Sequence, residues 1–211
     1  MQQGLFVTIE GCEGAGKSTQ CALLAAALEK QGYPVLLTRE PGGTEVSEKI
    51  RSILLDPGNS ELTPRVELLL YLASRAQLVR QVIEPALTED KVVISDRFHD
   101  STLAYQGGAR GLGVEEVGRV NAFATGGLLP EVTFLLDLPA EQGFSRKQSG
   151  EVDRMEGAGL DFHRRVRDSF LESAELDKHR IVVLDALRQA DDIAAEIESR
   201  VLALLNKKSR Q

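Results

Sequence analysis

Residues 5–18 read Leu5-Phe6-Val7-Thr8-Ile9-Glu10-Gly11-Cys12-Glu13-Gly14-Ala15-Gly16-Lys17-Ser18, an apolar run followed directly by a glycine-rich loop. The loop fits G-x-x-x-x-G-K-[ST], a pattern whose backbone N–H groups curl around a phosphate at the start of a helix. The motif requires a strand before it and a helix after it. The run at 5–10 supplies the strand, and an amphipathic stretch at 22–28 supplies the helix. The segment therefore predicts a P-loop fold.

The individual loop residues predict how a nucleoside triphosphate, ATP, is held. Lys17 is expected to neutralise the β- and γ-phosphates, and the Ser18 hydroxyl is expected to be a ligand of Mg²⁺. The predicted nucleotide-binding residues are Gly11, Cys12, Glu13, Gly14, Ala15, Gly16, Lys17, Ser18 and Thr19.

Apolar runs and helical patterns alternate along the rest of the chain. None of the runs alternates cleanly between apolar and polar residues, which is typical of strands buried on both faces. Alternating strands and helices indicate βαβ units around a parallel sheet. We therefore predict one α/β domain over residues 1–211, with strands at 5–10, 34–38, 91–96, 132–138 and 180–184, and helices at 17–31, 45–55, 64–88, 114–125, 139–147, 160–178 and 189–206.

Composition narrows the class of partner. The 211 residues are 42% hydrophobic and 27% charged, and the formal net charge is −7, which argues against general attraction to nucleic acid or to an anionic membrane. Cys12 and Cys21 fit neither a disulfide framework nor a zinc spacing. With no targeting segment or long apolar run recognised at the N-terminus, we expect a cytoplasmic protein.

Polar segments follow the predicted strands, where parallel sheets bind their ligands. Residues 39–43 follow the second strand, and Asp96-Arg97 ends the third. Asp96 is placed to orient Mg²⁺ or its water. Arg97 brings a permanently charged fork suited to bidentate phosphate binding. We expect these segments and the glycine loop to form one site.

The long helix at 64–88 carries a second set of candidates. Tyr71 and Arg75 lie one turn apart, so a ring and a guanidinium stand side by side and suit a nucleobase. Downstream, Thr102, Tyr105 and Gln106 occur at helical spacings and suit a base and a sugar. The core stripe of the long helix is predicted to be Leu69, Leu72, Ala76, Val79 and Ile83.

Together these motifs resemble the bacterial thymidylate kinases. The resemblance covers essentially the whole chain, and its most specific parts are Thr38-Arg39-Glu40-Pro41-Gly42-Gly43 and Ala104-Tyr105-Gln106-Gly107. It implies transfer of the ATP γ-phosphoryl group to dTMP, giving dTDP for dTTP biosynthesis. It further implies a three-layer P-loop kinase fold, a five-stranded parallel sheet in the order 2-3-1-4-5, and a homodimer.

The resemblance also implies residue roles. Tyr71 would stack on thymine, where the family usually has Phe, and Arg75 would donate to the 4-carbonyl. Thr102 and Gln106 would meet the other base edge, with Tyr105 under the deoxyribose. The acceptor phosphate would lie on Arg51 and Arg97, Glu13 would lie near the sugar 3′-hydroxyl or the magnesium shell, and Glu40 would support the arginines.

The phosphate loop has no basic residue among its variable positions 12–15, so the last catalytic cation is expected from a lid at about 143–156. We hypothesise that Arg146 and Arg154 close over the γ-phosphate. The predicted catalytic residues are then Lys17, Arg97, Arg146 and Arg154, and the predicted metal-binding residues are Ser18 and Asp96. Residues 185–188 are placed to touch the adenine, although an ordinary polar turn fits them nearly as well.

Two alternatives share the glycine loop: a P-loop kinase with a different acceptor, and a regulatory GTPase. A kinase acting on UMP, CMP or a deoxynucleoside is the nearest alternative, with Glu40 as a conceivable base for a nucleoside hydroxyl. Arg51, Arg75 and Arg97 suit a phosphorylated acceptor better. A regulatory GTPase would carry an Asn-Lys-x-Asp segment after a later strand, and Leu184-Asp185-Ala186-Leu187 stands there instead.

Overall fold

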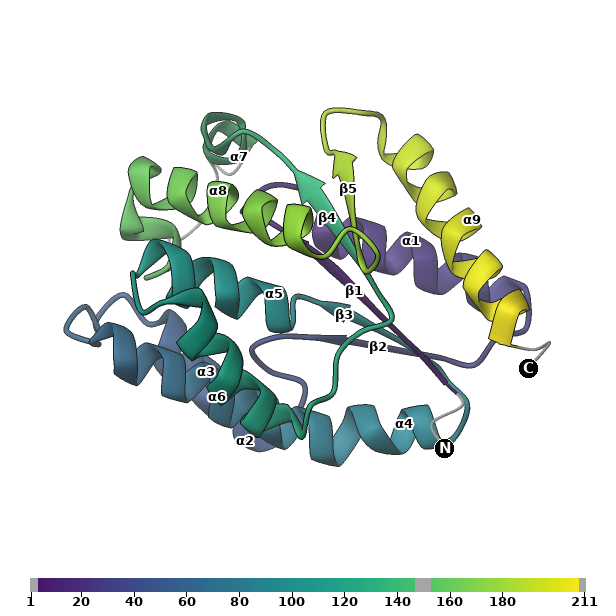
Figure 1. Cartoon of the computed structure of the whole chain (residues 1–211), viewed down its shortest axis with the longest axis horizontal. Helices are drawn as coiled ribbons and strands as arrows, with labels where there is room; N and C mark the ends of the chain where they lie inside the picture. The colour runs from purple at the N-terminus through teal and green to yellow at the C-terminus, as the bar shows by residue number, and fades with distance from the viewer. Residues whose placement is uncertain (1–3, 147–152, 209–211) are drawn as a thin grey trace.

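A parallel sheet forms the centre of the computed structural model, which describes residues 4–146 and 153–208 (Figure 1). In these residues five strands lie in the order β2-β3-β1-β4-β5, which confirms the predicted order. All neighbouring strands are parallel, so their carboxyl ends share one edge. The strands are β1 Leu5–Gly11, β2 Val35–Arg39, β3 Val92–Asp96, β4 Val132–Asp137 and β5 Ile181–Asp185.

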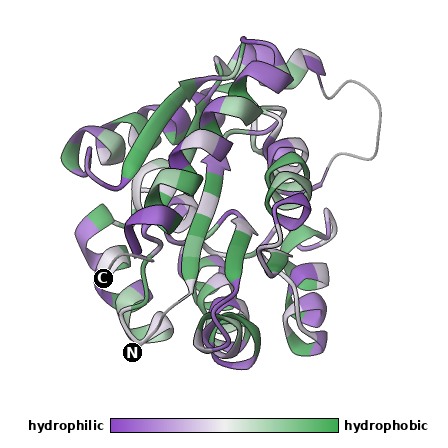
Figure 2. Ribbon diagram, turned by 90° about the vertical axis from the view of Figure 1, so that its right-hand side faces the viewer, coloured by the Kyte–Doolittle hydropathy of each residue, from purple (hydrophilic) through white to green (hydrophobic). Residues whose placement is uncertain are grey.

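Side chains of β1 alternate between two covered faces. Val7 and Ile9 pack with α1 (Lys17–Lys30) and α9 (Ala190–Lys208), whereas Phe6 packs on the opposite side. Figure 2 shows hydrophobic residues concentrated on the strands, whereas the surrounding helices carry both hydrophobic and hydrophilic residues. Within the described ranges, no helix has the length and apolar character needed to cross a membrane.

The other helices keep close to the predicted ranges. The structure has α2, α3, α6, α7 and α8 where the periodicity places helices, with ends that shift by at most two residues apart from the split described next. Residue 147, the last of one predicted helix, lies outside the described residues. The bounds are α2 Glu45–Leu55, α3 Pro64–Leu78, α6 Val114–Thr125, α7 Ala140–Arg146 and α8 Leu160–Leu176.

The predicted single helix at 64–88 is interrupted. After α3 come a π-helical turn, η1 (Val79–Ile83), and a short helix, α4 (Glu84–Thr88). Pro85 gives the physical reason: it has no N–H to donate, and its ring would collide with a carbonyl of the preceding turn in a regular α-helix. A wider turn accommodates both effects.

The predicted core stripe of this helix is partly wrong. Leu72, Val79 and Ile83 are buried, but Leu69 is 62% exposed. The fully buried polar residues Glu67 and Arg75 replace it on the covered surface. Periodicity locates an apolar stripe, but it does not reveal that a buried ion-pair network will take over part of the covered face.

The segment after β3 is helical, in keeping with the helical spacing of Thr102, Tyr105 and Gln106, although the predicted helix ranges did not include it. A short helix, α5 (His99–Thr102), continues into a π-helical stretch, η2 (Leu103–Ala109). The segment is short and contains two glycines, so it lacks the longer apolar period from which the other helices were predicted. A further 3₁₀ turn, η3 (Glu156–Ala158), precedes α8.

A buried polar network joins α5 to the sheet. Arg180, just before β5, binds Asp100 of α5 through two hydrogen bonds of 2.7 and 2.8 Å. Thr133 of β4 donates to Asp100 at 3.2 Å and contacts Thr8 of β1 at 2.7 Å. Burial would raise the pKa of Asp100, but Arg180 holds it below its ordinary value.

We predict that Arg180→Leu destabilises the fold by about 3–5 kcal/mol near pH 8, because it leaves a buried carboxylate unpaired. In the native protein the lowered pKa of Asp100 contributes stability at all pH values above the unfolded-state pKa, and this contribution is lost as the pH falls through the folded-state pKa. In the variant, burial raises that pKa, so protonation relieves the cost on acidification. Denaturant unfolding should therefore show a gap between the two proteins that shrinks from pH 8 to pH 5.

The control is Arg164→Leu, which removes ion pairs that lie in solvent on α8. Its unfolding free energy should stay close to that of the native protein at every pH. A gap for Arg180→Leu that is independent of pH would contradict the assignment of the cost to the Asp100 carboxylate.

Candidate active site

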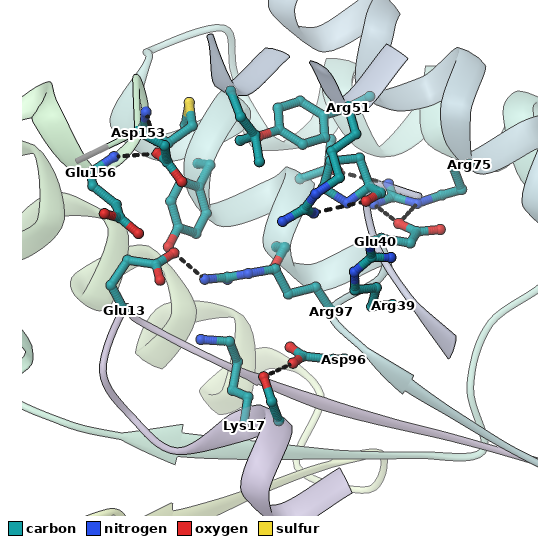
Figure 3. Close-up of a pocket in the computed structure, with 18 of the residues that line it drawn as sticks. Glu13, Lys17, Arg39, Glu40, Arg51, Arg75, Asp96, Arg97, Asp153 and Glu156 are labelled. Carbon is teal, nitrogen blue, oxygen red and sulfur yellow. Dashed lines mark hydrogen bonds and ion pairs between the residues drawn. The ribbon is translucent and has the colours of Figure 1, made fainter. Parts of the chain in front are cut away.

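A cavity of about 410 Å³ opens at the carboxyl edge of the sheet. Its walls come from the glycine loop, residues 39–41, α2, α3, the end of β3, α5 with η2, and residues 153–156. Figure 3 shows Lys17 and Asp96 on one side, Arg97 crossing the centre, and Arg51, Arg75 and Glu40 on the other side. The segments that the sequence analysis assigned to one site therefore do meet in one cavity.

The glycine loop wraps the start of α1. Gly11, Gly14 and Gly16 have φ values of 140°, 73° and 90°, which glycine adopts readily. Lys17 is buried, and its Nζ donates to the carbonyl of Cys12 at 2.8 Å. Burial lowers the pKa of Lys17, and the charge of Arg97 adds to this effect. An anion in the loop would relieve both costs.

The two predicted metal-binding residues lie in direct contact. The Ser18 hydroxyl donates to Oδ2 of Asp96 at 2.5 Å. Ser18 is in the first turn of α1, and Asp96 is the last residue of β3, so the parallel sheet brings together residues far apart in sequence. Hydroxyl and carboxylate oxygens are the ligand types that Mg²⁺ takes.

Arg97 links the glycine loop to the opposite wall. Its guanidinium donates to the Gly11 carbonyl at 3.0 Å, to Ser101 Oγ at 3.1 Å and to Glu13 Oε1 at 2.5 Å. Figure 3 shows the contact with Glu13. Its backbone has φ 72°, a conformation that costs energy in residues other than glycine. The surrounding structure therefore holds this arginine in a fixed and unfavourable conformation.

A buried carboxylate beneath Arg97 supports that conformation. Glu10 accepts from the backbone N–H groups of Phe98 and Ser101 at 2.7 and 3.2 Å, and from Ser101 Oγ at 2.5 Å. Burial and the neighbouring Asp100 raise the pKa of Glu10 to about 7. Glu10 was assigned no role from the sequence, although a carboxylate within a buried strand is itself a signal.

Arg75 is fixed by protein groups on all sides. Its guanidinium contacts Glu40 at 2.5 and 2.7 Å, Thr102 at 2.7 Å, Asn121 at 2.9 Å and the carbonyl of Phe98 at 2.8 Å. It is 1% exposed and still lines the cavity. The second oxygen of Glu40 is buried and has no hydrogen-bond partner among the described residues. Asn121 was not anticipated from the sequence.

The remaining predicted acceptor residues also line the cavity. Arg51 donates to the carbonyl of Pro41 at 2.9 Å, and Tyr71 stands on the neighbouring helix, where burial raises the pKa of its phenol. The Tyr105 ring lies 5.2 Å from the guanidinium carbon of Arg97. Arg39, also in the wall, pairs with Glu48 instead of with Glu40.

Glu67 was not predicted from the sequence. It lies behind the cavity wall and binds side chains of that wall and its surroundings. It is fully buried on α3 and binds Gln106, Arg110 and Arg154. Its sequence signal was weak: a charged residue within an otherwise apolar helical stretch.

The two predicted lid arginines occupy different surroundings. Arg146 is exposed and donates to the carbonyls of Gly14, at 3.3 Å, and Ala186, at 3.4 Å. Arg154 is engaged by the Leu54 carbonyl at 2.8 Å and by Glu67 at 2.6 Å. A position over a γ-phosphate would require Arg154 to leave a buried carboxylate. Residues 147–152 of the predicted lid lie outside the described residues.

The start of the lid packs directly on the glycine loop. A Cβ added to Gly14 would lie 2.7 Å from the carbonyl oxygen of Gly143 in α7. A Cβ added to Gly143 would collide with the carbonyl oxygen of Glu13. Backbone therefore meets backbone at this contact. Close by, the Ala186 carbonyl bonds to Arg146, while Arg188 pairs with Glu196.

Comparisons with known proteins agree with this arrangement. A family model described as thymidylate kinase matches residues 9–197. The chain is 50% identical to the thymidylate kinase of Deinococcus radiodurans, over 95% of this chain and 98% of the relative. It is 48% identical to that of Desulfosudis oleivorans, over 96% and 97%. The crystal structure of thymidylate kinase from Ehrlichia chaffeensis is similar, with a TM-score of 0.77 at 33% identity over 94% of this chain and 98% of that one.

Proposed function

The chain belongs to the thymidylate kinase family and catalyses ATP-dependent phosphorylation of dTMP to dTDP, and we propose that the cavity described above is its active site. The observation that carries this assignment is the position of Arg97. It bonds to the Gly11 carbonyl in the glycine loop and to Ser101 in the opposite wall. A cation there would lie between a donor phosphate bound on the loop and an acceptor phosphate bound on the wall.

We propose that ATP binds with its phosphates on residues 11–19. Lys17 would exchange the Cys12 carbonyl for phosphate oxygens, which are stronger partners for an ammonium group. Ser18 and Asp96 would hold Mg²⁺, whose charge supports the phosphates when it is bound. The adenine would lie toward residues 185–188, near the end of β5.

dTMP is proposed to occupy the opposite half of the cavity. Arg51 and Arg97 would hold its phosphate, with Glu13 near the sugar 3′-hydroxyl or the magnesium shell. Tyr71 would stack on thymine, and Tyr105 would pack under the deoxyribose. Arg75, fixed by Glu40, would meet the 4-carbonyl, and Thr102 and Gln106 would meet the other base edge. All of these residues line the cavity.

Alignment and charge stabilisation account for the proposed catalysis. The acceptor is already an ionised phosphate oxygen, so the protein needs no general base. Lys17 and Arg97 supply fixed positive charge from the two sides, and Arg146 is proposed as the lid cation because it already contacts the glycine loop. Arg154 is proposed to stabilise the lid stem through Glu67. A cytoplasmic location belongs to the same proposal, supported by two free, buried cysteines.

Steady-state rates with dTMP, dUMP, UMP and thymidine test the acceptor. We expect dTMP to give the highest kcat/KM, and thymidine to be poorer by at least about 100-fold because it leaves Arg51 and Arg97 without a phosphate. UMP should be disfavoured by its 2′-hydroxyl against Tyr105. A clear preference for thymidine would contradict the assignment of the arginine-lined half to a phosphate.

The lid proposal predicts different losses for the two arginines. Arg146→Ala should lower kcat roughly 100- to 1000-fold, as removal of a transition-state donor does, and leave the thermal midpoint unchanged. Arg154→Ala should lower the thermal midpoint, because it removes a partner of the buried Glu67. A kcat within twofold of the native value for Arg146→Ala would rule out this residue as the lid cation.

We also propose a homodimer, formed through α2, α3 and α6. These helices pack against one another and leave apolar side chains in solvent. Phe123 is 90% exposed, which is costly for a large aromatic residue unless a partner covers it. The proposed contact residues are Val46, Ile53, Val66, Leu69, Val120 and Phe123.

Phe123→Glu should convert the protein to a monomer in sedimentation experiments, since a charge replaces the most exposed aromatic residue of the proposed interface. Leu176→Glu is the matched control. Leu176 is comparably exposed, at 87%, but lies at the end of α8, outside the proposed interface. The proposal is wrong if the native protein sediments as a monomer, or if both variants remain dimers.

A further inference from the structure

Glu67 accepts four hydrogen bonds although it does not line the cavity. Gln106 Nε2 and Arg110 Nε donate to Oε1, at 2.9 and 3.1 Å. Arg110 and Arg154 donate to Oε2, at 3.0 and 2.6 Å. A carboxylate offers about four lone-pair sites, so these donors occupy them all. Burial alone would raise the pKa of Glu67, but the hydrogen bonds from Arg110, Gln106 and Arg154 and the charge of Arg110 lower it.

An ionised carboxylate only accepts hydrogen bonds, and this restricts the Gln106 side chain. An amide presents an oxygen on one side and an NH₂ group on the other. If the Gln106 amide turned over, its oxygen would face the Glu67 oxygens, and two acceptors would repel each other without water to separate them. Gln106 is 2% exposed, so water cannot take that role. The amide oxygen is therefore the group left for a ligand in the cavity.

We propose that Glu67 is a positioning residue that fixes the Gln106 amide with its oxygen toward the cavity, and so selects a base whose ring nitrogen carries a hydrogen. Thymine carries hydrogen on N3, whereas a cytosine-type base has a bare, accepting nitrogen at that position. The fixed oxygen attracts the first and repels the second. This inference rests on the proposed placement of the base beside Gln106, and it assigns specificity to a residue that never touches the base.

The test compares kcat/KM for dTMP and for 5-methyl-dCMP, which keeps the methyl group and sugar but has an accepting N3 and a 4-amino group in place of the carbonyl assigned to Arg75. The native protein and the variants all keep Arg75, so a change in the ratio of the two kcat/KM values between them reports on the N3 position. The variant is Glu67→Gln combined with Arg110→Gln, which removes one negative and one positive charge together and limits the folding defect. A neutral amide at position 67 allows Gln106 to turn over. We expect kcat/KM for dTMP to fall and kcat/KM for 5-methyl-dCMP to rise. The ratio of the two values should therefore decrease at least about 10-fold relative to the native protein.

Three controls separate polarity from packing. Arg110→Gln alone keeps the Glu67–Gln106 hydrogen bond and should keep the native preference for dTMP over 5-methyl-dCMP. Glu67→Asp keeps a side chain that only accepts hydrogen bonds, and should keep most of that preference. Gln106→Leu should narrow the preference, and adding the Glu67→Gln change to it should have no further effect.

Several outcomes would overturn the proposal. Equal loss of rate with both nucleotides would reduce Glu67 to a packing role, and loss of preference in Glu67→Asp as complete as in the amide variant would exclude polarity as the cause. Equal kcat/KM values for the two nucleotides in the native enzyme would contradict the proposed recognition of the base by Gln106, but not the kinase activity. A native enzyme that uses neither would overturn the proposed function as well.

Discussion

The pairing of β1 with β3 is the constraint on which the site depends. Ile9 stands opposite Asp96, and the N–H of Arg97 bonds to the Ile9 carbonyl at 3.0 Å. β1 continues for two residues beyond this point, so the glycine loop begins beside Arg97. A slip of one residue in this register would turn Asp96 away from Ser18 and Glu10 away from Ser101, because side chains alternate between the faces of a strand. The buried apolar residues of β1, which face helices on both sides, make such a slip costly.

Buried carboxylates make the acceptor half of the cavity rigid. Glu10, Glu40 and Glu67 are each almost fully buried, and each binds donors from a different segment of the chain. Burying a charge is expensive, and the hydrogen bonds that each carboxylate accepts offset part of that cost. The partners are therefore held in place: Glu10 fixes the Arg97 segment, Glu40 fixes Arg75 and Glu67 fixes Gln106. The groups that face the substrate are oriented before it arrives, which is the condition for catalysis by alignment.

The sequence predicted the framework well because its signals are local. Strand and helix positions follow from runs and periods of apolar residues, and the glycine loop from eight consecutive residues. The supporting network could not be predicted in this way. Glu67 reaches Arg154 and Gln106, and Arg75 reaches Asn121, across separations of 87, 39 and 46 residues, and no local pattern encodes such partners. The exposure of Leu69 and the pairing of Arg154 with Glu67 were not predicted for the same reason, because both depend on which distant segment covers a given surface.

The contact between Gly14 and Gly143 limits how this enzyme can diverge. Most tight contacts in a core join side chains, and a larger residue on one side can be accommodated by a smaller one on the other. Here a side chain at either position would collide with a main-chain carbonyl oxygen of the facing segment. Every residue type has this oxygen, so no substitution in the facing segment can remove the collision. A second substitution therefore cannot make room for the first, and either glycine can be replaced only if α7 or the glycine loop moves as a whole. Lineages of this enzyme should accumulate changes around the lid while this pair stays the same.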